Sequence, residues 1–156
     1  MYLWNVKALA HELKEKTLSQ QQKMKYFLVF ILLNVIMIEC SYYLGMSFNF
    51  NIYDLIGSLE TVVVNIAGII FCYRANRSGD NDDFIERFIC LSLPITIRLL
   101  FISVIVLPII LLIDTFVLRG WFLTENTSII DVLIYAIEVI GYYLWIRSYL
   151  IKIANK

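Results

Sequence analysis

Four ionisable side chains stand inside long apolar stretches of the chain and are the residues best placed for chemistry or transport. Arg98 interrupts the stretch 95–113. The other three are glutamates in the remaining stretches: Glu39, Glu60 and Glu138. Inside a bilayer such groups turn toward the interior of a helix bundle and pair there. Three glutamates facing one arginine leave at least one carboxyl group without a counter-charge. Burial favours the neutral form of such a group, which is what proton-coupled transport requires.

The last apolar stretch carries the clearest pattern in the chain. Six polar and aromatic residues recur at alternating spacings of four and three, which places them on one face of a helix. The other faces are mostly Ile, Leu and Val, so we expect this face to point into the bundle. This polar stripe consists of Asp131, Tyr135, Glu138, Tyr142, Trp145 and Tyr149.

The stripe and the buried charges together predict an intramembrane polar network. We expect Arg98 to pair with Glu138, with Glu39 or Glu60 as a second partner. Such a network either fixes the register of the helices or forms a transport site, and both interpretations stay open. Its predicted members are Glu39, Glu60, Arg98, Asp131, Tyr135, Glu138 and Tyr142.

Two features of the flanking stretches would position this network. Pro94 cannot donate a backbone hydrogen bond, so we expect a bend one turn before Arg98. The second stretch carries small and polar residues at helical spacing, which is typical of close helix contact in membranes. This seam consists of Ser58, Thr61, Asn65, Gly68 and Cys72. Glu60 lies about 100° away from it on a helix and should face a different neighbour.

The composition requires a membrane setting for these elements. The chain is 60% hydrophobic and 17% charged, with a mean hydropathy of +0.76, whereas soluble domains contain about a quarter charged residues. A membrane helix needs about 20 apolar residues, and four stretches reach this length. The sequence therefore predicts an all-α, polytopic four-helix membrane bundle. The predicted spans are residues 26–46, 53–73, 88–113 and 129–149.

An amphipathic segment precedes the first span. Apolar residues recur at helical spacing at Leu3, Val6, Ala10 and Leu13, and Trp4 suits the headgroup region. Ser19 and Gln22 have the spacing of a capping box that starts a new helix. We therefore expect residues 1–18 to form a separate helix on the membrane surface and residues 19–156 to form the transmembrane domain.

The basic residues predict the orientation. Eleven of the thirteen Lys and Arg residues fall in the N-terminal segment, the loop 74–87 or the C-terminus. Arg119 stands alone in the opposite loops. By the positive-inside rule both termini are cytoplasmic, and we expect a multi-pass protein of the bacterial inner membrane.

Known catalytic and metal-binding patterns are not recognisable. His11 is the only histidine, and Cys40, Cys72 and Cys90 form no C-x-x-C pair. The aspartate-rich loop 77–83 fails the calcium-loop pattern and reads as a turn before a helix. We expect no catalytic, cofactor or metal site, and the balanced charge gives no reason to expect nucleic acid.

The stretch FCYRANRSGDNDDFIERFICLSLPITIR, residues 71–98, resembles a family of small uncharacterised bacterial four-helix inner-membrane proteins. The shared features are an aromatic-basic-Ala-Asn run, a glycine-containing loop, Asp-Phe, Arg-Phe and a later hydrophobic-Arg pair. This sequence has Arg77-Ser-Gly79 where the family has adjacent glycines, so the loop differs. The resemblance covers under a fifth of the chain and implies a bacterial inner-membrane location.

Three classes of function remain open. A non-enzymatic regulator or immunity-type protein that binds a protein partner fits the size and the missing catalytic motif. A small proton-coupled transporter or channel fits the buried glutamates and would require a homo-oligomer. A membrane glutathione-utilising enzyme is the third class, since Glu86-Arg87 is similar to its Glu-Arg pair, but Leu91, Ser92 and Leu93 stand where its asparagine is expected.

Overall fold

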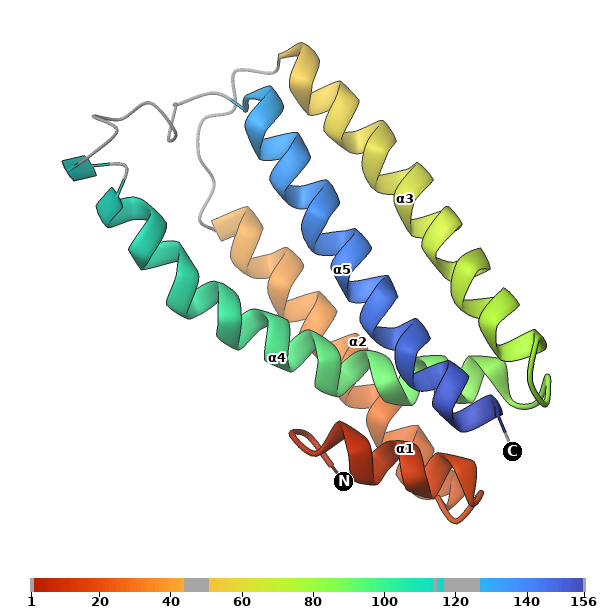
Figure 1. Cartoon of the computed structure of the whole chain (residues 1–156). Helices are drawn as coiled ribbons and strands as arrows, with labels where there is room; N and C mark the ends of the chain where they lie inside the picture. Colours follow the sequence, from red (N-terminus) through yellow and green to blue (C-terminus); the bar gives the residue numbers. More distant parts are fainter. Residues whose placement is uncertain (1, 44–50, 114, 117–126, 156) are drawn as a thin grey trace.

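The computed structural model describes residues 2–43, 51–113, 115–116 and 127–155 (Figure 1). The described part of the chain forms five helices and contains no strand, and four of the helices are long and apolar enough to cross a membrane. This confirms the predicted all-α membrane bundle with a preceding short amphipathic helix. The helices are α1 (Val6–Lys14), α2 (Gln20–Tyr43), α3 (Ile52–Arg77), α4 (Phe84–Ile113) and α5 (Ile129–Ala154).

The helix bounds differ from the predicted spans mainly at the starts. α2 begins six residues before the predicted span, and α4 begins at Phe84 rather than at residue 88. Residues 44–46 of the first predicted span lie outside the described residues. Polar first turns explain the difference, because a hydrophobicity pattern does not include the capping turns that continue a helix past the apolar core.

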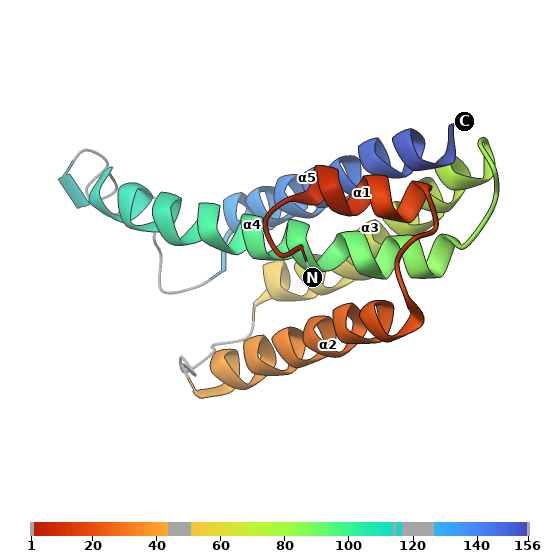
Figure 2. The same ribbon diagram turned by 90° about the horizontal axis from the view of Figure 1, so that it is seen from below.

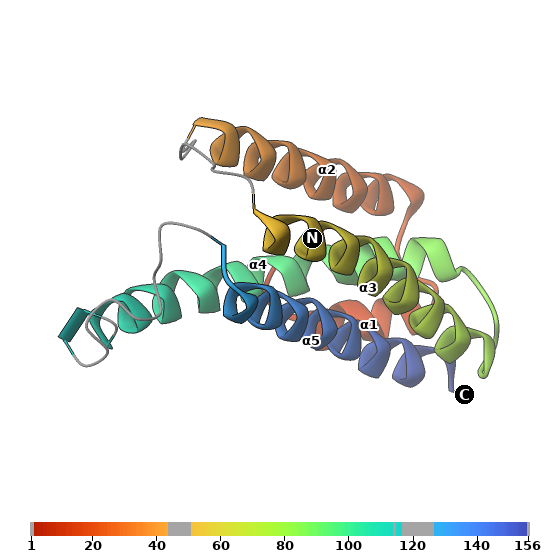
Figure 3. The same cartoon turned by 90° about the horizontal axis from the view of Figure 1, so that it is seen from above.

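The long helices form two pairs that run in opposite directions (Figures 1 and 3). α3 and α5 run side by side in the same direction and make the most extensive contact in the molecule. α2 packs on α4 and, within the described ranges, on no other helix. Both chain termini lie at one end of the bundle, together with α1 and the α3–α4 loop 78–83. We call this the α1 end.

α1 is separated from α2 by a break in the chain direction. Lys16 has a positive φ of 53°, and the Ser19 hydroxyl accepts a hydrogen bond from the Gln22 amide while the Gln22 side chain accepts one from the Ser19 amide. These are the two bonds of the predicted capping box. A straight helix through Ser19 is thereby excluded, and α1 lies across α4 and α5 instead (Figure 2).

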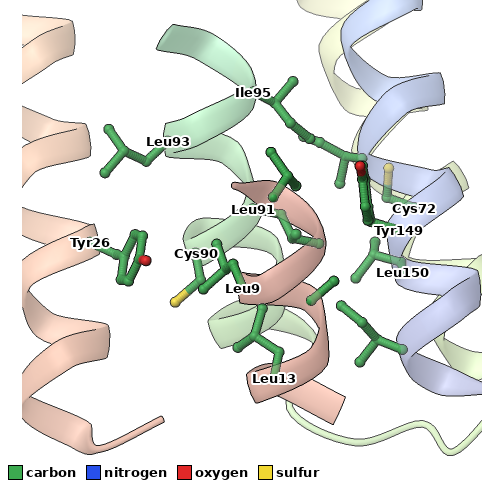
Figure 4. Packing of buried hydrophobic residues seen from close by; sticks show 14 of the residues in the cluster. Leu9, Leu13, Tyr26, Cys72, Cys90, Leu91, Leu93, Ile95, Tyr149 and Leu150 are labelled. Atoms are coloured by element: carbon green, nitrogen blue, oxygen red, sulfur yellow. The ribbon is translucent and has the colours of Figure 1, made fainter. Parts of the chain in front are cut away.

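The apolar face of α1 completes the core of the molecule. Val6, Leu9 and Leu13 are fully or almost fully buried, whereas Leu3 remains 42% exposed. Figure 4 shows Leu9 beside Cys90 of α4, and Leu9 and Leu13 belong to the same buried cluster as Leu91 and Leu150. Burial of this kind contributes roughly 1.5–3 kcal/mol per large side chain, so α1 is an integral part of the fold.

The predicted bend occurs in α4. Figure 1 shows α4 changing direction in its first half, the part that holds Pro94. Residues 91–95 around this proline are all buried, and α1, α2 and α5 surround them. Beyond the bend α4 moves away from α5, as both Figure 1 and Figure 3 show.

The predicted small-residue seam holds α3 against α5. The Tyr143 ring lies directly on Gly68, where an added Cβ would come within 2.3 Å of it. The Tyr143 hydroxyl donates to Asn65 Oδ1 at 2.7 Å, and the Cys72 thiol donates to the Tyr143 carbonyl at 3.5 Å. Three of the five seam residues therefore contact one tyrosine, while Ser58 is exposed.

Candidate functional site

Arg98 binds the N-terminal segment rather than a carboxylate. Its Nη2 donates to the Trp4 carbonyl, and its guanidinium lies 5.5 Å from the centre of the Trp4 ring and 5.7 Å from that of Trp145. Trp4 also packs edge-on against Phe101 at 5.5 Å. Cation–π contacts with two indole rings and a hydrogen bond to one carbonyl therefore stabilise the charge of this arginine. Arg98 Nε is buried and has no hydrogen-bond partner.

The predicted pairing of Arg98 with Glu138 is therefore wrong. Within the part of the chain that the structure describes, no ion pair joins Arg98 to Glu138, Glu39 or Glu60. Glu138 and Glu39 are exposed on the outer surface of their helices. The partner was missed because Trp4 is distant in sequence and the N-terminal segment was expected on the membrane surface, not against α4.

Glu60 is half-buried, and its carboxyl group has no hydrogen-bond partner among the described residues. Both of its carboxyl oxygens are inaccessible. The residue lies on α3, one turn after Gly57, which packs on Val132 of α5.

The polar stripe of α5 divides into two halves. Tyr149 is buried, and Tyr142 and Trp145 are half-buried against the core. The Tyr142 ring also packs edge-on against the Tyr143 ring, with 5.1 Å between the ring centres. The prediction of an inward face holds for this half, which lies toward the α1 end.

The other half of the stripe points outward, which corrects the prediction. Tyr135 is 42% exposed, and Asp131 and Glu138 are also exposed. Asp131 caps α5, because its Oδ2 accepts from the Ser128 amide at 2.8 Å and from the Ser128 hydroxyl at 2.6 Å. The Ser-x-x-Asp spacing of residues 128–131 is a capping pattern and could have assigned this role from sequence.

The best-connected polar cluster lies at the α1 end and was not predicted. Arg87, at the start of α4, is only 2% exposed, and its two terminal nitrogens donate to the two carboxylate oxygens of Asp80 at 2.6 Å each. Arg87 Nη1 also donates to Asn76 Oδ1 at 3.0 Å. Asn76 in turn donates to the Asp82 carbonyl at 3.0 Å. We call Asn76, Asp80 and Arg87 the loop clamp, because they fix the α3–α4 loop by a bidentate, charge-assisted contact.

The loop clamp sets the electrostatics of the loop. Hydrogen bonding from the Arg87 guanidinium lowers the pKa of Asp80 below its ordinary value. On the exposed side of the loop, Lys16 pairs with Asp82 at 2.8 Å, and the hydrogen bond to Asp82 raises the pKa of Lys16. An ion pair also joins Lys23 of α2 to Glu86 of α4. Charged contacts thus join the loop to α4 and to the α1–α2 linker, and join α2 to α4.

A polar groove of about 860 Å³ opens beside this loop. α1 forms one wall, the α3–α4 loop another, and the end of α5 the third. Gly79 lies against Ala154, where an added Cβ would come within 2.5 Å, and Lys14 Nζ donates to the Asn155 carbonyl at 2.8 Å. The lining residues are Lys14, Lys16, Gly79, Asp80, Asp82, Ile153, Ala154 and Asn155.

The arrangement does not form the Glu-Arg unit of a glutathione enzyme. Glu86 binds Lys23 on one side of α4, whereas Arg87 points to Asp80 on another. Among the described side chains, no group of three His, Cys, Asp or Glu residues is arranged to hold a metal ion. These contacts instead hold α1, the α3–α4 loop and the end of α5 around the polar groove.

The segment 71–98, which carries the family resemblance, contains all three residues of the loop clamp. It runs through the end of α3, the loop clamp and α4 as far as Arg98. Comparison with known proteins finds no matching family model, curated protein or solved structure. The resemblance therefore stays a prediction.

Proposed function

We propose that the protein is a non-enzymatic membrane protein that binds a polar segment of a cytoplasmic protein at the α1 end. The observation that carries the proposal is the 860 Å³ groove, which presents two lysines and two aspartates beside apolar side chains. Mixed charge of this kind selects a partner by electrostatic complementarity and fixes its register. A regulator or an immunity-type protein would use such a surface.

Rigidity of the groove supports this proposal. The loop clamp holds one wall, and the Lys16–Asp82 and Lys14–Asn155 contacts join the walls to one another. A preformed surface loses less conformational entropy on binding than a flexible loop does. Arg87 is buried and both carboxylate oxygens of Asp80 are bound to it, so recognition falls to the exposed Lys14, Lys16 and Asp82.

We further propose that the α1 end faces the cytoplasm of a bacterium, with the protein in the inner membrane. This end carries the basic residues of the N-terminal segment, the α3–α4 loop and the C-terminus. A partner at this end would be a soluble or membrane-associated cytoplasmic protein. Labelling of cysteines introduced at Asn155 and Lys25 should occur only from the cytoplasmic side.

A crosslinking experiment tests the partner proposal. A photoreactive residue at Asn155, in the groove, should give one discrete adduct in intact cells, whereas the same residue at exposed Lys25 of α2 should not. The same partner should co-purify at fixed stoichiometry and be lost from Asp82→Lys but not from Glu15→Lys. Glu15 is a matched acidic surface control outside the groove. A pure chain without a partner, together with no adduct at 155, would contradict the proposal.

Glu60 supports a second candidate function, a small proton-coupled transporter or channel that acts as a homo-oligomer. A buried carboxyl group without a hydrogen-bond partner is energetically costly in a membrane helix, and such groups commonly belong to transport sites. Proton flux into liposomes reconstituted with the protein would be expected to stop in Glu60→Gln and to continue in Glu138→Gln, since Glu138 is exposed. Absence of flux in the wild-type protein would reject this candidate.

A further inference from the structure

A second, apolar groove of about 340 Å³ runs between α3 and α5. Its size falls within the range of ligand pockets, and Gly68 lets the two helices approach closely at its floor. Its lining is apolar apart from the tyrosine ring. The lining residues are Val63, Val64, Ala67, Gly68, Phe71, Ile140, Tyr143 and Leu144.

An arginine closes this groove toward the α1 end. Arg147 follows Ile140 and Leu144 at helical spacing, so it lies on the same face of α5. Its guanidinium stacks on the Phe71 ring at 4.4 Å from the ring centre. Arg147 Nε is buried without a hydrogen-bond partner, and within the described ranges no carboxylate pairs with this side chain. Arg74, which is exposed, follows Phe71 by three residues on the same face of α3.

The depth of Arg147 places its charge at the boundary of the membrane. Each of these 26-residue helices is roughly 39 Å long, about 9 Å more than the hydrocarbon core of a bilayer. Arg147 precedes the end of α5 by seven residues, roughly 10 Å. If the helix is centred, its Cα lies roughly 5 Å inside the hydrocarbon boundary, and a long arginine side chain reaches the headgroups from there.

We propose that this groove is a specific site for one anionic glycerophospholipid. An acyl chain occupies the apolar groove, and the phosphate accepts hydrogen bonds from Arg147, with Arg74 beside it. The guanidinium lies over the Phe71 ring, and its two terminal nitrogens make no hydrogen bond to the described residues, which suits bidentate binding of phosphate. Basic pockets between membrane helices recognise anionic headgroups for the same reason. This site lies apart from the polar groove and goes beyond the partner-binding proposal.

Native mass spectrometry of the delipidated full-length chain in detergent tests the site. Phosphatidylglycerol and phosphatidylcholine with identical acyl chains are the two probes. The wild-type protein should bind one phosphatidylglycerol several-fold more tightly than phosphatidylcholine. Arg147→Met should weaken phosphatidylglycerol binding about fivefold, as expected for loss of one cation near the headgroups. It should weaken phosphatidylcholine binding less, because the choline cation already offsets the phosphate charge of that lipid. Arg147→Lys should keep most of the preference.

Two matched controls separate the site from general charge and surface effects. Arg77→Met removes the same charge from the exposed end of α3 and should leave the lipid preference intact. Ala67→Phe fills the groove and should weaken both lipids, whereas Ile137→Phe, on the exposed side of α5, should weaken neither. Thermal unfolding in detergent verifies that each variant is folded. The comparison of the two lipids on the wild-type protein tests the site even if a variant fails to fold.

Several results would overturn the proposal. Equal binding of the two lipids to the wild-type protein would do so, as would an equal loss of preference in Arg77→Met and Arg147→Met. Competition by inorganic phosphate as strong as that by the lipid would show that the acyl groove contributes nothing. A Leu144→Cys variant that forms a disulfide-linked dimer in membranes would assign the groove to a second copy of the chain instead.

Discussion

The two halves of α5 carry the same residue pattern but have different surroundings. Toward the α1 end, Tyr142, Trp145 and Tyr149 pack against α4 and the core. Toward the opposite end, Tyr135 and Glu138 continue the same spacing and are exposed. The cause is the path of α4, which bends near Pro94 and leaves α5, as Figure 1 shows.

This comparison teaches that periodicity identifies a face but not what covers it. α3 packs closely on α5, because the missing side chain of Gly68 leaves room for the Tyr143 ring. No such small-residue seam holds α4 to the outer half of α5. The exposed part of the stripe is therefore available to lipid or to another chain, and the half toward the α1 end supports the fold.

The largest expected effect concerns the loop clamp at the α1 end. Arg87→Met removes a buried cation and leaves Asp80 and Asn76 without their partner, which should reduce the free energy of unfolding by about 3 kcal/mol. Thermal and denaturant unfolding in detergent measure this loss. The double variant Arg87→Met with Asp80→Asn should lose less than the sum of the single variants.

The exposed ion pair beside the clamp is the control for that prediction. Lys16 and Asp82 lie at 2.8 Å but are about half exposed, so Lys16→Met should cost well under 1 kcal/mol. Equal losses in Lys16→Met and Arg87→Met would show that the clamp does not stabilise the α1 end.

Two glycines compare a packed face with an open one. Gly68 lies on α3 against α5, whereas Gly141 lies on an uncovered face of α5. Gly68→Ala should lower stability by about 2 kcal/mol, because its Cβ would come within 2.3 Å of the Tyr143 ring. Gly141→Ala meets nothing within 4 Å and should be neutral or stabilising by up to about 1 kcal/mol through helix propensity. In thermal unfolding, Gly68→Ala should lower the melting temperature, whereas Gly141→Ala should leave it unchanged or raise it. A destabilised Gly141→Ala would indicate that a partner covers that face.

A pair of double-mutant cycles compares the two halves of the stripe directly. Arg98→Met with Trp145→Leu should show a coupling free energy of about 1 kcal/mol, because the guanidinium lies over that indole ring. Arg98→Met with Glu138→Gln should be additive within about 0.5 kcal/mol, since the two side chains do not meet. Strong coupling of Arg98 to Glu138 would restore the ion pair expected from sequence.

The smallest expected effect is a pH dependence at the α1 end. The Arg87 contact lowers the pKa of Asp80, so this carboxylate stabilises the folded state above its unfolded pKa of about 3.9. That contribution is lost as the pH falls through the lower folded pKa. The difference in melting temperature between the wild-type protein and Asp80→Asn should therefore be constant above about pH 5 and shrink below about pH 4. A difference that grows in acid would contradict the assignment.

Much of the architecture could be predicted from short-range patterns. The apolar run lengths gave the four long helices, the spacing of Val6, Ala10 and Leu13 gave the amphipathic face of α1, and Ser19 with Gln22 gave the break after it. The seam on α3 was also recognisable, because small residues at helical spacing have few other uses in a membrane helix.

The candidate site could be predicted less well, because it depends on contacts between distant segments. The partner of Arg98 is Trp4, ninety-four residues away in the chain, and nothing in the local spacing of either residue indicates the other. The partner of Arg87 is only seven residues away, but the sequence pattern around Asp80 indicated a solvated turn and not an ion pair. Charge complementarity alone favoured Glu138 for Arg98, whereas the path of α4 made that contact impossible.

Hydrophobicity and its period are properties of the chain itself, so the sequence alone determined which segments become membrane helices, which residues share a face and where α1 must end. The direction in which α4 leaves its bend, the insertion of α1 against α4 and α5, and the closing of the loop around Arg87 are collective results of packing. Only the tertiary structure decided these, because each depends on which surfaces fit together at van der Waals distance and not on the pattern along any one helix.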